Sequence, residues 1–212
     1  MVNRERAYYM LATFISGILF LYISILVGKD FFRTIDFQMM QYLQTTIARI
    51  YDVPFSFFTL AGSTEVTLLV MALIFILVLL RVRHMFMGLS LYFSLFAIEI
   101  VGKLMIFHPN PPAIFNRYSL NIRLPSSFIV HTASSFPSGH MSRASFVAFI
   151  LVFLIFKMKH HKYLKYMLCI LIFIFILGMF ISRIYLGEHW FSDVIGGLVL
   201  GSTVAGLAVC FW

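Results

Sequence analysis

Long stretches of apolar residues, separated by short polar segments, run along the chain from end to end. Most are close to the roughly 20 residues that an α-helix needs to cross a hydrocarbon core about 30 Å thick. The first has no small-residue cleavage site after it and is too long for a signal-peptide core, so we expect an uncleaved span. The pattern predicts an all-α bundle of six transmembrane helices, at about residues 7–27, 64–80, 85–107, 142–156, 166–184 and 190–211.

Residues 31–50, between the first two predicted spans, follow a different pattern. Apolar residues recur there at helical spacing, and polar residues take the other positions; the apolar set is Ile35, Met39, Leu43, Ile47 and Ile50. This period predicts a short amphipathic helix at the membrane interface. A break at residues 52–54 follows, and we expect residues 55–62 to dip toward the membrane before the second span.

The composition points to the same class of protein. Hydrophobic residues make up 61% of the chain and charged residues only 11%, whereas soluble domains carry about 25% charged residues. No repeat, low-complexity tract or linker divides the sequence, so we expect one integral-membrane domain over residues 1–212. Cys169 and Cys210 fall inside apolar stretches, and no disulfide is expected. Membrane lipids, and no nucleic acid, are the expected partners, with the oligomeric state left open.

Lysines and arginines indicate how the chain is oriented. Their numbers on the two sides of the predicted topology are equal, so the count alone decides nothing. The connections at residues 81–83 and 157–165 are short and basic and contain no acidic residue, which is typical of cytoplasmic loops. We therefore expect a multi-pass protein of the cell membrane, with both termini in the cytoplasm and the remaining loops on the outer side.

Candidate catalytic residues lie at the outer end of the fifth and sixth spans. His189 and Asp193 are four residues apart where a helix begins, so they share one face. A carboxylate there can accept a hydrogen bond from one imidazole nitrogen and leave the other nitrogen nucleophilic. Arg183 ends the preceding span, where its guanidinium could bind phosphate oxygens. This combination favours phosphoryl-transfer chemistry.

A second candidate segment, residues 137–140, reads Pro-Ser-Gly-His and precedes the fourth span. Backbone N–H groups of a turn that leads into a helix N-terminus form an anion site. Ser138 can donate its hydroxyl, Gly139 allows close approach, and His140 is placed to act as a general acid. The histidines and carboxylates are too few to indicate a metal site, so neither a metal nor another cofactor is expected.

These residues resemble the motifs of the type 2 phosphatidic acid phosphatase (PAP2) family, which read K-x6-R-P, P-S-G-H and S-R-x5-H-x3-D. Residues 137–140 match the second motif and residues 182–193 match the third in full. In the first, Lys103 and Pro111 have the family spacing, but Asn110 stands at the arginine position. The candidates for the missing positive charge are Arg117, Arg123 and Arg143. Arg143 is the best placed, because it lies one helical turn beyond His140.

The resemblance implies a membrane enzyme that hydrolyses a lipid phosphate without a metal. His189 would attack phosphorus and form a phosphohistidine, Asp193 would orient His189, and His140 would transfer the protons. The implied phosphate-binding residues are Lys103, Ser138, Gly139 and Arg183, with Asn110 and Arg143 as further candidates.

Several alternatives stay open. The substrate could be a polyprenyl diphosphate, a phosphatidate or a phosphatidylglycerol phosphate, and the choice between monophosphate and diphosphate is not fixed by the motifs. The same histidines could serve a transferase that passes the phosphoryl or head group to an alcohol. A non-enzymatic lipid transporter could use the basic cluster for binding alone.

Other polar residues near the motifs have simpler interpretations. Lys103 follows Glu99 by one helical turn, so an ion pair between them competes with a phosphate role. His108 and His131 are interpreted as solvated loop residues without a catalytic part. His160 and His161 belong to the basic loop expected in the cytoplasm and are predicted to face lipid head groups.

Overall fold

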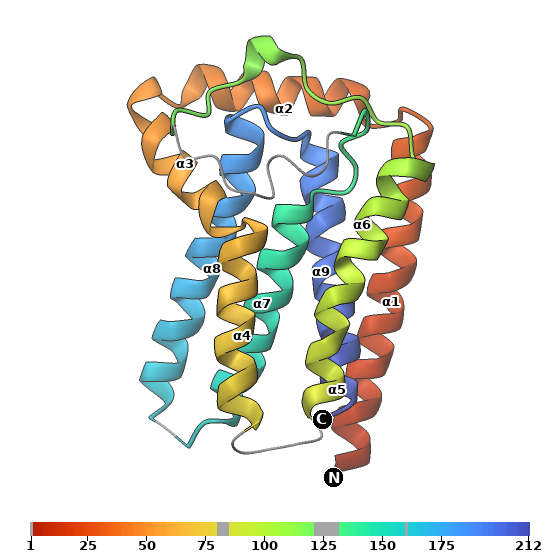
Figure 1. Ribbon diagram of the computed structural model, residues 1–212, viewed down its shortest axis with the longest axis vertical. Helices are drawn as coiled ribbons and strands as arrows, with labels where there is room; N and C mark the ends of the chain where they lie inside the picture. The colour runs from red at the N-terminus through yellow and green to blue at the C-terminus, as the bar shows by residue number, and fades with distance from the viewer. Residues whose placement is uncertain (1, 80–84, 121–131, 160) are drawn as a thin grey trace.

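The computed structural model describes residues 2–79, 85–120, 132–159 and 161–212, and within these ranges the chain is helical with no strand (Figure 1). The α-helices are α1 (Val2–Gly28), α2 (Arg33–Thr46), α3 (Asp52–Ala61), α4 (Thr64–Leu79), α5 (Met85–Ser90), α6 (Ser94–Met105), α7 (Gly139–Lys157), α8 (Lys162–Tyr185) and α9 (Phe191–Cys210). Short 3-10 turns are η1 (Arg49–Tyr51), η2 (Leu91–Phe93) and η3 (Ala113–Phe115). Arg81, Arg83, Arg123, His131 and His160 lie outside the described residues.

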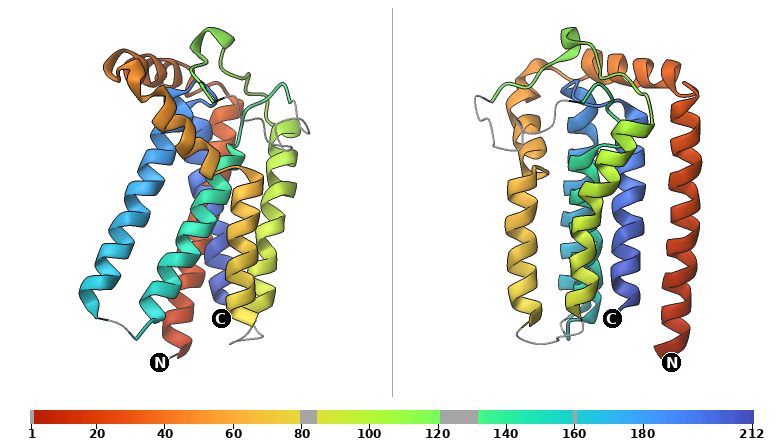
Figure 2. Two further views of the ribbon diagram at one scale, coloured as in Figure 1. Left: turned by 60° about the vertical axis from the view of Figure 1, so that its left-hand side comes forward. Right: turned by 45° about the vertical axis from the view of Figure 1, so that its right-hand side comes forward.

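The long helices run side by side, and α2 lies across one end of the bundle, with α3 descending from it (Figures 1 and 2). Both termini lie at the opposite end. In the described part of the chain, 5 helices are long and apolar enough to cross a membrane. The count becomes 6 if η1 and α3, which meet α4 at an angle of 49°, form one broken span with it. The prediction of a dip over residues 55–62 corresponds to this bend at α3.

The outer faces of the bundle are apolar. Helices α1 and α8 leave large hydrophobic side chains exposed along their length, among them Phe14, Leu21, Phe173 and Ile174. A soluble protein rarely exposes a continuous apolar surface of this extent. Together with the long apolar helices, this surface identifies a multi-pass membrane protein.

Helix α9 is the centre of the bundle and packs chiefly against α7 and α1. The α7–α9 contact is close because α9 presents glycine there. A Cβ atom at Gly201 would lie 2.0 Å from Ser145 Oγ and 2.1 Å from the Ser142 carbonyl oxygen. Glycine therefore allows the two helix backbones to approach at this point. Since α7 and α9 carry residues of the second and third motifs, this contact brings those motifs together.

The amphipathic helix predicted over residues 31–50 exists as α2, but its packing face differs from the predicted one. Ile35 is 41% exposed, whereas Asp36 is 2% exposed and Met40 is fully buried. The Gln44 side-chain amide also packs inward and donates hydrogen bonds to the carbonyl oxygens of Phe115 and Tyr185. Polar contacts therefore dock α2 on the bundle, and its apolar Ile35 is left outward.

Candidate active site

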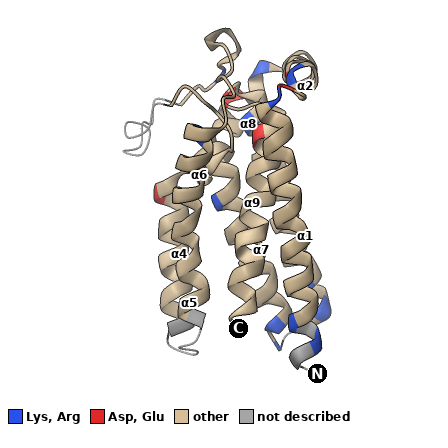
Figure 3. Cartoon of the chain, turned by 90° about the vertical axis from the view of Figure 1, so that its right-hand side faces the viewer, with Lys and Arg blue, Asp and Glu red and all other residues tan. Residues whose placement is uncertain are grey.

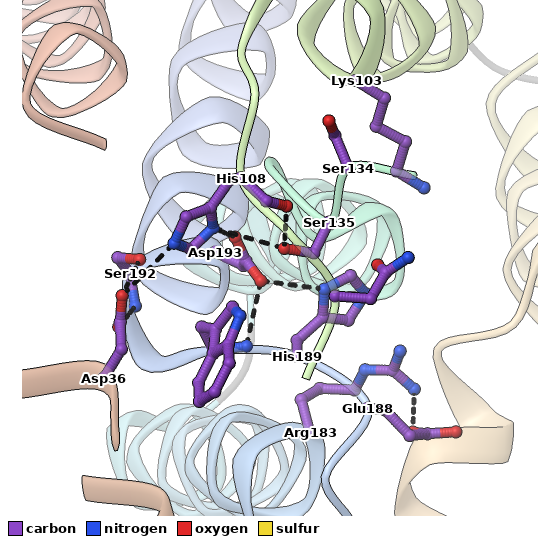
Figure 4. Close-up of polar contacts among 12 residues, drawn as sticks. Asp36, Lys103, His108, Ser134, Ser135, Arg183, Glu188, His189, Ser192 and Asp193 are labelled. Carbon is purple, nitrogen blue, oxygen red and sulfur yellow. Dashed lines mark hydrogen bonds and ion pairs between the residues drawn. The ribbon is translucent and has the colours of Figure 1, made fainter. Parts of the chain in front are cut away.

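All three sequence motifs lie at the end of the bundle that α2 covers (Figure 1). Figure 4 shows Lys103 of the first motif near Arg183 and His189 of the third. Lys103 lies in the last turn of α6, and Gly139 and His140 begin α7. Arg183 lies in the last turn of α8, and Asp193 lies in the first turn of α9.

A tight turn between α8 and α9 places Arg183 next to His189. Gly187 has φ of +71°, and a Cβ atom on it would lie 2.2 Å from the Phe115 carbonyl oxygen, so only glycine fits. The backbone N–H of His189 donates to the Arg183 carbonyl oxygen at 3.1 Å. The five residues between Arg183 and His189 in the third motif thus form the end of α8 and the turn that follows it.

His189 is buried and contacts Asp193, as their spacing predicts. Its Nδ1 lies 3.3 Å from Asp193 Oδ2, which also accepts a 2.9 Å hydrogen bond from the Trp190 N–H. Because a carboxylate only accepts hydrogen bonds, this contact holds the proton on Nδ1 and leaves Nε2 with a free lone pair. Burial lowers the pKa of His189; the bond to Asp193 opposes this effect, and Arg183 and Lys103 add to it. The imidazole is therefore neutral near pH 7.

The second motif is attached directly to the third. The Ser138 N–H donates to the Asp193 carbonyl oxygen at 3.1 Å. His140 follows in α7, partly buried, with its Cβ near Gly62 at the α3–α4 bend. His140 lies within electrostatic range of His189 and Arg183. The two motif histidines therefore face a common, positively charged region.

Lys103 and Arg143 share one carboxylate, that of Glu99. Lys103 Nζ lies 2.8 Å from Glu99 Oε1, and Arg143 lies 2.6 Å from Glu99 Oε2. The ion pair expected between Lys103 and Glu99 is thus present. A Cβ atom at Gly139 would lie 2.1 Å from both Glu99 carboxylate oxygens. An acidic group therefore lies against the first residue of α7, where the second motif was expected to receive an anion.

Arg183 also has a carboxylate partner. Its Nη1 donates to Thr59 Oγ1 and to Glu188 Oε2, and Thr59 Oγ1 donates to Glu188 Oε2 at 2.8 Å. Thr59 comes from α3, so the helix that follows α2 takes part in holding Arg183. The contact of Arg183 with Glu188 is visible in Figure 4.

Several buried donors at this end have no protein acceptor. Among the described residues, the buried polar atoms without a hydrogen-bond partner include Ser138 Oγ, Arg143 Nε and Arg183 Nε. A buried polar atom without a partner costs free energy of about 1–3 kcal/mol. Three such atoms on residues expected to bind phosphate form a set of donors suited to an anion.

The remaining candidates for phosphate binding have other contacts. The Asn110 side-chain amide donates to the Thr132 carbonyl oxygen at 2.8 Å and is exposed. Arg117 donates to the Gln44 carbonyl oxygen at 2.9 Å, and its guanidinium lies over the Tyr185 ring. Of the two candidates for the missing charge that the structure describes, Arg117 and Arg143, Arg143 is therefore the one that lies beside Lys103.

His108 is buried and bonded, so its interpretation as a solvated loop residue is wrong. It is 5% exposed, and its Nδ1 lies 2.7 Å from Asp193 Oδ1. Its Nε2 lies 3.5 Å from Asp36 Oδ2. Burial by itself lowers the pKa of His108, but the hydrogen bonds and charges of Asp193 and Asp36 outweigh it and raise the pKa to about 9. His108 is thus charged near pH 7, whereas His189 is neutral. Figure 4 shows the two imidazoles on either side of the Asp193 carboxylate.

Four residues of this region have no signal in the sequence that would mark them as part of a site: Asp36, Thr59, His108 and Glu188. They come from α2, α3 and two connections, and only the fold brings them to the motifs. His108 lies within the span of the first motif and Glu188 within that of the third, but neither stands at a fixed position of its motif. Within the described ranges, no group of 3 or more His, Cys, Asp and Glu side chains is arranged to hold a metal ion.

The fold and the site define a multi-pass membrane protein with a histidine–aspartate pair and clustered cations at one end. The family model of the PAP2 superfamily matches residues 83–212. The chain therefore belongs to the PAP2 superfamily, and the family predicted from the motifs is confirmed. The match includes all three motifs. A comparison with curated protein sequences found no match.

Solved structures of two membrane proteins have a similar fold. A transmembrane PAP2 type phosphatidylglycerolphosphate phosphatase from Bacillus subtilis superposes with a TM-score of 0.74 at 20% identity, covering 93% of this chain and 94% of that one. LpxE from Aquifex aeolicus gives a TM-score of 0.58 at 21% identity, covering 82% of this chain and 94% of that one. Both likenesses cover more of the chain than residues 83–212, which the family model matches.

Proposed function

We propose that this protein is a lipid phosphatase that hydrolyses a phosphate monoester or diphosphate lipid through a phosphohistidine on His189. The observation that carries the proposal is the orientation of His189 by Asp193, beside His140 and three buried donors without protein acceptors. A neutral imidazole with a free Nε2 is a nucleophile, and unpaired guanidinium and hydroxyl donors suit the charged oxygens of a phosphate.

In the first step, His189 Nε2 attacks phosphorus and forms a P–N bond, while the bond from phosphorus to the lipid oxygen breaks. His140 gives its proton to the departing oxygen, so the lipid leaves as an alcohol, or as a monophosphate if the substrate is a diphosphate. Asp193 keeps Nδ1 protonated and stabilises the positive charge that develops on the His189 ring.

In the second step, water attacks the phosphorus of the phosphohistidine. His140, now unprotonated, takes a proton from the water, and the P–N bond breaks. Inorganic phosphate leaves, His189 is neutral again, and His140 is protonated for the next cycle. One histidine thus serves as acid and then as base, as microscopic reversibility requires of a double displacement.

Lys103, Ser138, Arg143, Arg183 and the Gly139 N–H stabilise the equatorial oxygens. Arg143 takes the part of the arginine that Asn110 replaces. In this proposal the cations neutralise the phosphate, and no metal ion is required. The carboxylates of Glu99 and Glu188 hold the cations in the free protein, and the phosphate oxygens then compete with them for the same donors.

The position of the site at a helix end suits a lipid substrate. A phosphate at head-group depth reaches His189 while its hydrocarbon chain stays in the membrane. We place this end on the outer side of the cell membrane, with six spans and α2 at the interface. Phosphatidate, polyprenyl diphosphate and phosphatidylglycerol phosphate all fit this description, and a similar fold belongs to a phosphatidylglycerolphosphate phosphatase.

Purified protein offered these three lipids in mixed micelles tests the proposal. Wild-type protein is expected to release inorganic phosphate from at least one lipid, with no loss of activity in the presence of a metal chelator. His189→Ala is expected to release none. His161→Ala is the matched control, because His161 lies at the opposite end of the bundle, and it should retain wild-type activity.

Other outcomes separate the rival functions. A modified lipid that appears only with an added alcohol, without free phosphate, would instead identify a transferase. Wild-type protein that binds a lipid phosphate but neither releases nor transfers phosphate would contradict an enzymatic function.

A further inference from the structure

We propose that His108 and Asp36 are positioning residues that hold the Asp193 carboxylate against His189 and thereby couple helix α2 to the reaction. The proposal rests on the proposed phosphatase function for its activity readout. It concerns two residues that stand at none of the fixed positions of the three motifs.

The geometric basis is a continuous chain of polar contacts through the buried end of the bundle (Figure 4). Asp193 Oδ2 faces His189 Nδ1, and Asp193 Oδ1 faces His108 Nδ1 at 2.7 Å. His108 Nε2 faces Asp36 Oδ2 at 3.5 Å. Asp36 in turn accepts bonds from the Ser192 N–H at 2.7 Å and the Ser192 hydroxyl at 2.8 Å.

Each carboxylate oxygen of Asp193 therefore serves a different histidine. The contact with His108 is the shorter of the two, so it limits rotation of the carboxylate about its Cβ–Cγ bond. Rotation would move Oδ2 away from His189 Nδ1. The proton of His189 would then no longer be held on Nδ1, and Nε2 would not be kept unprotonated. His108 thus acts on the nucleophile through Asp193 and has no need to touch the substrate.

Burial makes this chain sensitive to the loss of any one member. Asp36 is 2% exposed, His108 5% and Asp193 0%. Removing one partner from a buried ion pair leaves the other charge without compensation, which is far more costly than losing a surface pair. Two aspartates flank His108, so its charge lies between both carboxylates.

The two histidines differ in charge, and this difference affects the reactivity of His189. His108, with its pKa raised to about 9, shares the negative charge of Asp193 and weakens its pull on the His189 proton. The neighbouring charged groups are Asp36 from α2 and Asp193 from α9, with His189 beyond Asp193. Asp30 and Arg33 line the cavity of about 820 Å³ that also reaches His108. Loss of the His108 proton at high pH would leave two buried carboxylates around a neutral ring.

Asp36 is the one residue of helix α2 among the four linked by these polar contacts, His189, Asp193, His108 and Asp36. The Asp36 carboxylate lies at the N-terminus of α9, where a negative charge is favourable. A displacement of α2 would therefore move Asp36 away from both Ser192 and His108. The helix that covers the site is in this way coupled to the orientation of the nucleophile.

The dependence of kcat on pH, measured for lipid-phosphate hydrolysis in mixed micelles, tests the proposal. Wild-type kcat is expected to fall as the pH rises through about 9, because His108 then loses its proton. His108→Asn keeps an N–H donor near the Nδ1 position but cannot titrate, so this fall should be absent. His108→Leu removes the donor, and its kcat should be at least about tenfold below that of His108→Asn.

Asp36→Asn provides the sharper comparison. It removes one of the two carboxylates that raise the pKa of His108, so the alkaline fall in kcat should move to lower pH. Asp30→Asn is the matched control, since it removes the same charge from the connection before α2 without a hydrogen bond to His108. An alkaline fall that keeps its wild-type position in both His108→Asn and Asp36→Asn would overturn the proposal.

A second readout does not depend on the substrate. In NMR titrations of the histidine side chains in detergent, the pKa of His189 should be higher in His108→Asn than in the wild type, because Asp193 then acts on His189 alone. An unchanged His189 titration would overturn the positioning role. Absence of phosphate release by wild-type protein would instead overturn the proposed phosphatase function, and the NMR result would still decide the role of His108.

Discussion

Asp193 contacts four residues of the site through its side chain and its backbone carbonyl. Its side chain accepts from His189, His108 and the Trp190 N–H, and its backbone carbonyl accepts from Ser138. One residue of the third motif, Asp193, therefore contacts the proposed nucleophile, the N-terminus of α9 and the second motif at once. A substitution at this position that keeps the shape of the side chain should therefore lower the rate of phosphate release more than the stability of the fold.

Asp193→Asn tests this reasoning with an isosteric change. An amide can present its NH₂ to His189 Nδ1 and favour the wrong tautomer, and it leaves His108 with one carboxylate fewer. We expect kcat for phosphate release to fall roughly 10²–10⁴-fold, the range of similar substitutions in catalytic triads, with a smaller change in KM. Thermal unfolding in detergent provides the control: a folded variant with wild-type kcat would contradict the role of Asp193.

Glu99 is the second residue whose contacts have a functional consequence. It pairs with both Lys103 and Arg143 and lies against Gly139. In the proposed function it competes with phosphate for two cations, and in this way it limits the affinity for the product as well as for the substrate.

Glu99→Gln removes that competing charge and nearly keeps the volume. We expect inorganic phosphate to inhibit the variant about tenfold more strongly, equivalent to ~1.4 kcal/mol of binding free energy. Glu65→Gln, on α4 and outside the motifs, is the matched control. Inorganic phosphate should inhibit it as strongly as it inhibits the wild type. Weaker inhibition by phosphate in Glu99→Gln would show that Glu99 positions the cations and does not compete for them.

At the scale of elements, the α7–α9 contact decides whether the second and third motifs meet. Gly201 faces Ser142 and Ser145 so closely that no side chain fits. Gly17 of α1 also faces α9, but a Cβ atom there would lie at an ordinary 3.6 Å from Thr203 Cγ2. The two glycines therefore offer a matched pair of sites for the same substitution.

Gly201→Ala is expected to lower the free energy of unfolding by about 1–3 kcal/mol, the cost of overpacking a well-packed interface, and to reduce phosphate release by separating the motifs. Gly17→Ala should change neither quantity appreciably. Melting temperatures in detergent and the initial rate of phosphate release check both variants. Equal melting temperatures for the two variants would contradict the close α7–α9 contact.

The sequence predicted the elements well where a period or a local spacing carries the signal. Apolar stretches gave the long helices, and the spacing of His189 and Asp193 gave their contact. Burial of Asp36 ran against the amphipathic pattern, because its carboxylate accepts hydrogen bonds from Ser192 of α9 on the same side of α2 that buries Met40. His108 was misread for the same reason: its partners lie 72 and 85 residues away along the chain, and only the fold brings them together.

At the scale of the whole molecule, charge is distributed unequally between the two ends of the bundle. Lysines and arginines lie at both ends, while acidic residues gather at the end that α2 covers (Figure 3). The end with both termini and the α7–α8 connection is rich in lysine, including Lys157, Lys159 and Lys162. By the positive-inside rule we propose that this end lies in the cytoplasm and that the site faces outward.

Single cysteines in a Cys169→Ser, Cys210→Ser background test this orientation. Arg49→Cys, in η1 beside the site end, should react with a membrane-impermeant maleimide on intact cells. Lys159→Cys, in the α7–α8 connection, should react only after the cells are opened. The reverse pattern of labelling would place the site on the cytoplasmic side and contradict the proposed orientation.

The central claim is that His189 carries the phosphoryl group between the lipid and water. The most direct measurement is mass spectrometry of protein quenched in alkali during turnover of a lipid phosphate, in which phosphohistidine is stable. A phosphoryl group on His189 is predicted in the wild type and is predicted to be absent in His189→Ala. Turnover without any phosphorylated histidine, or with the group on another residue, would contradict the account.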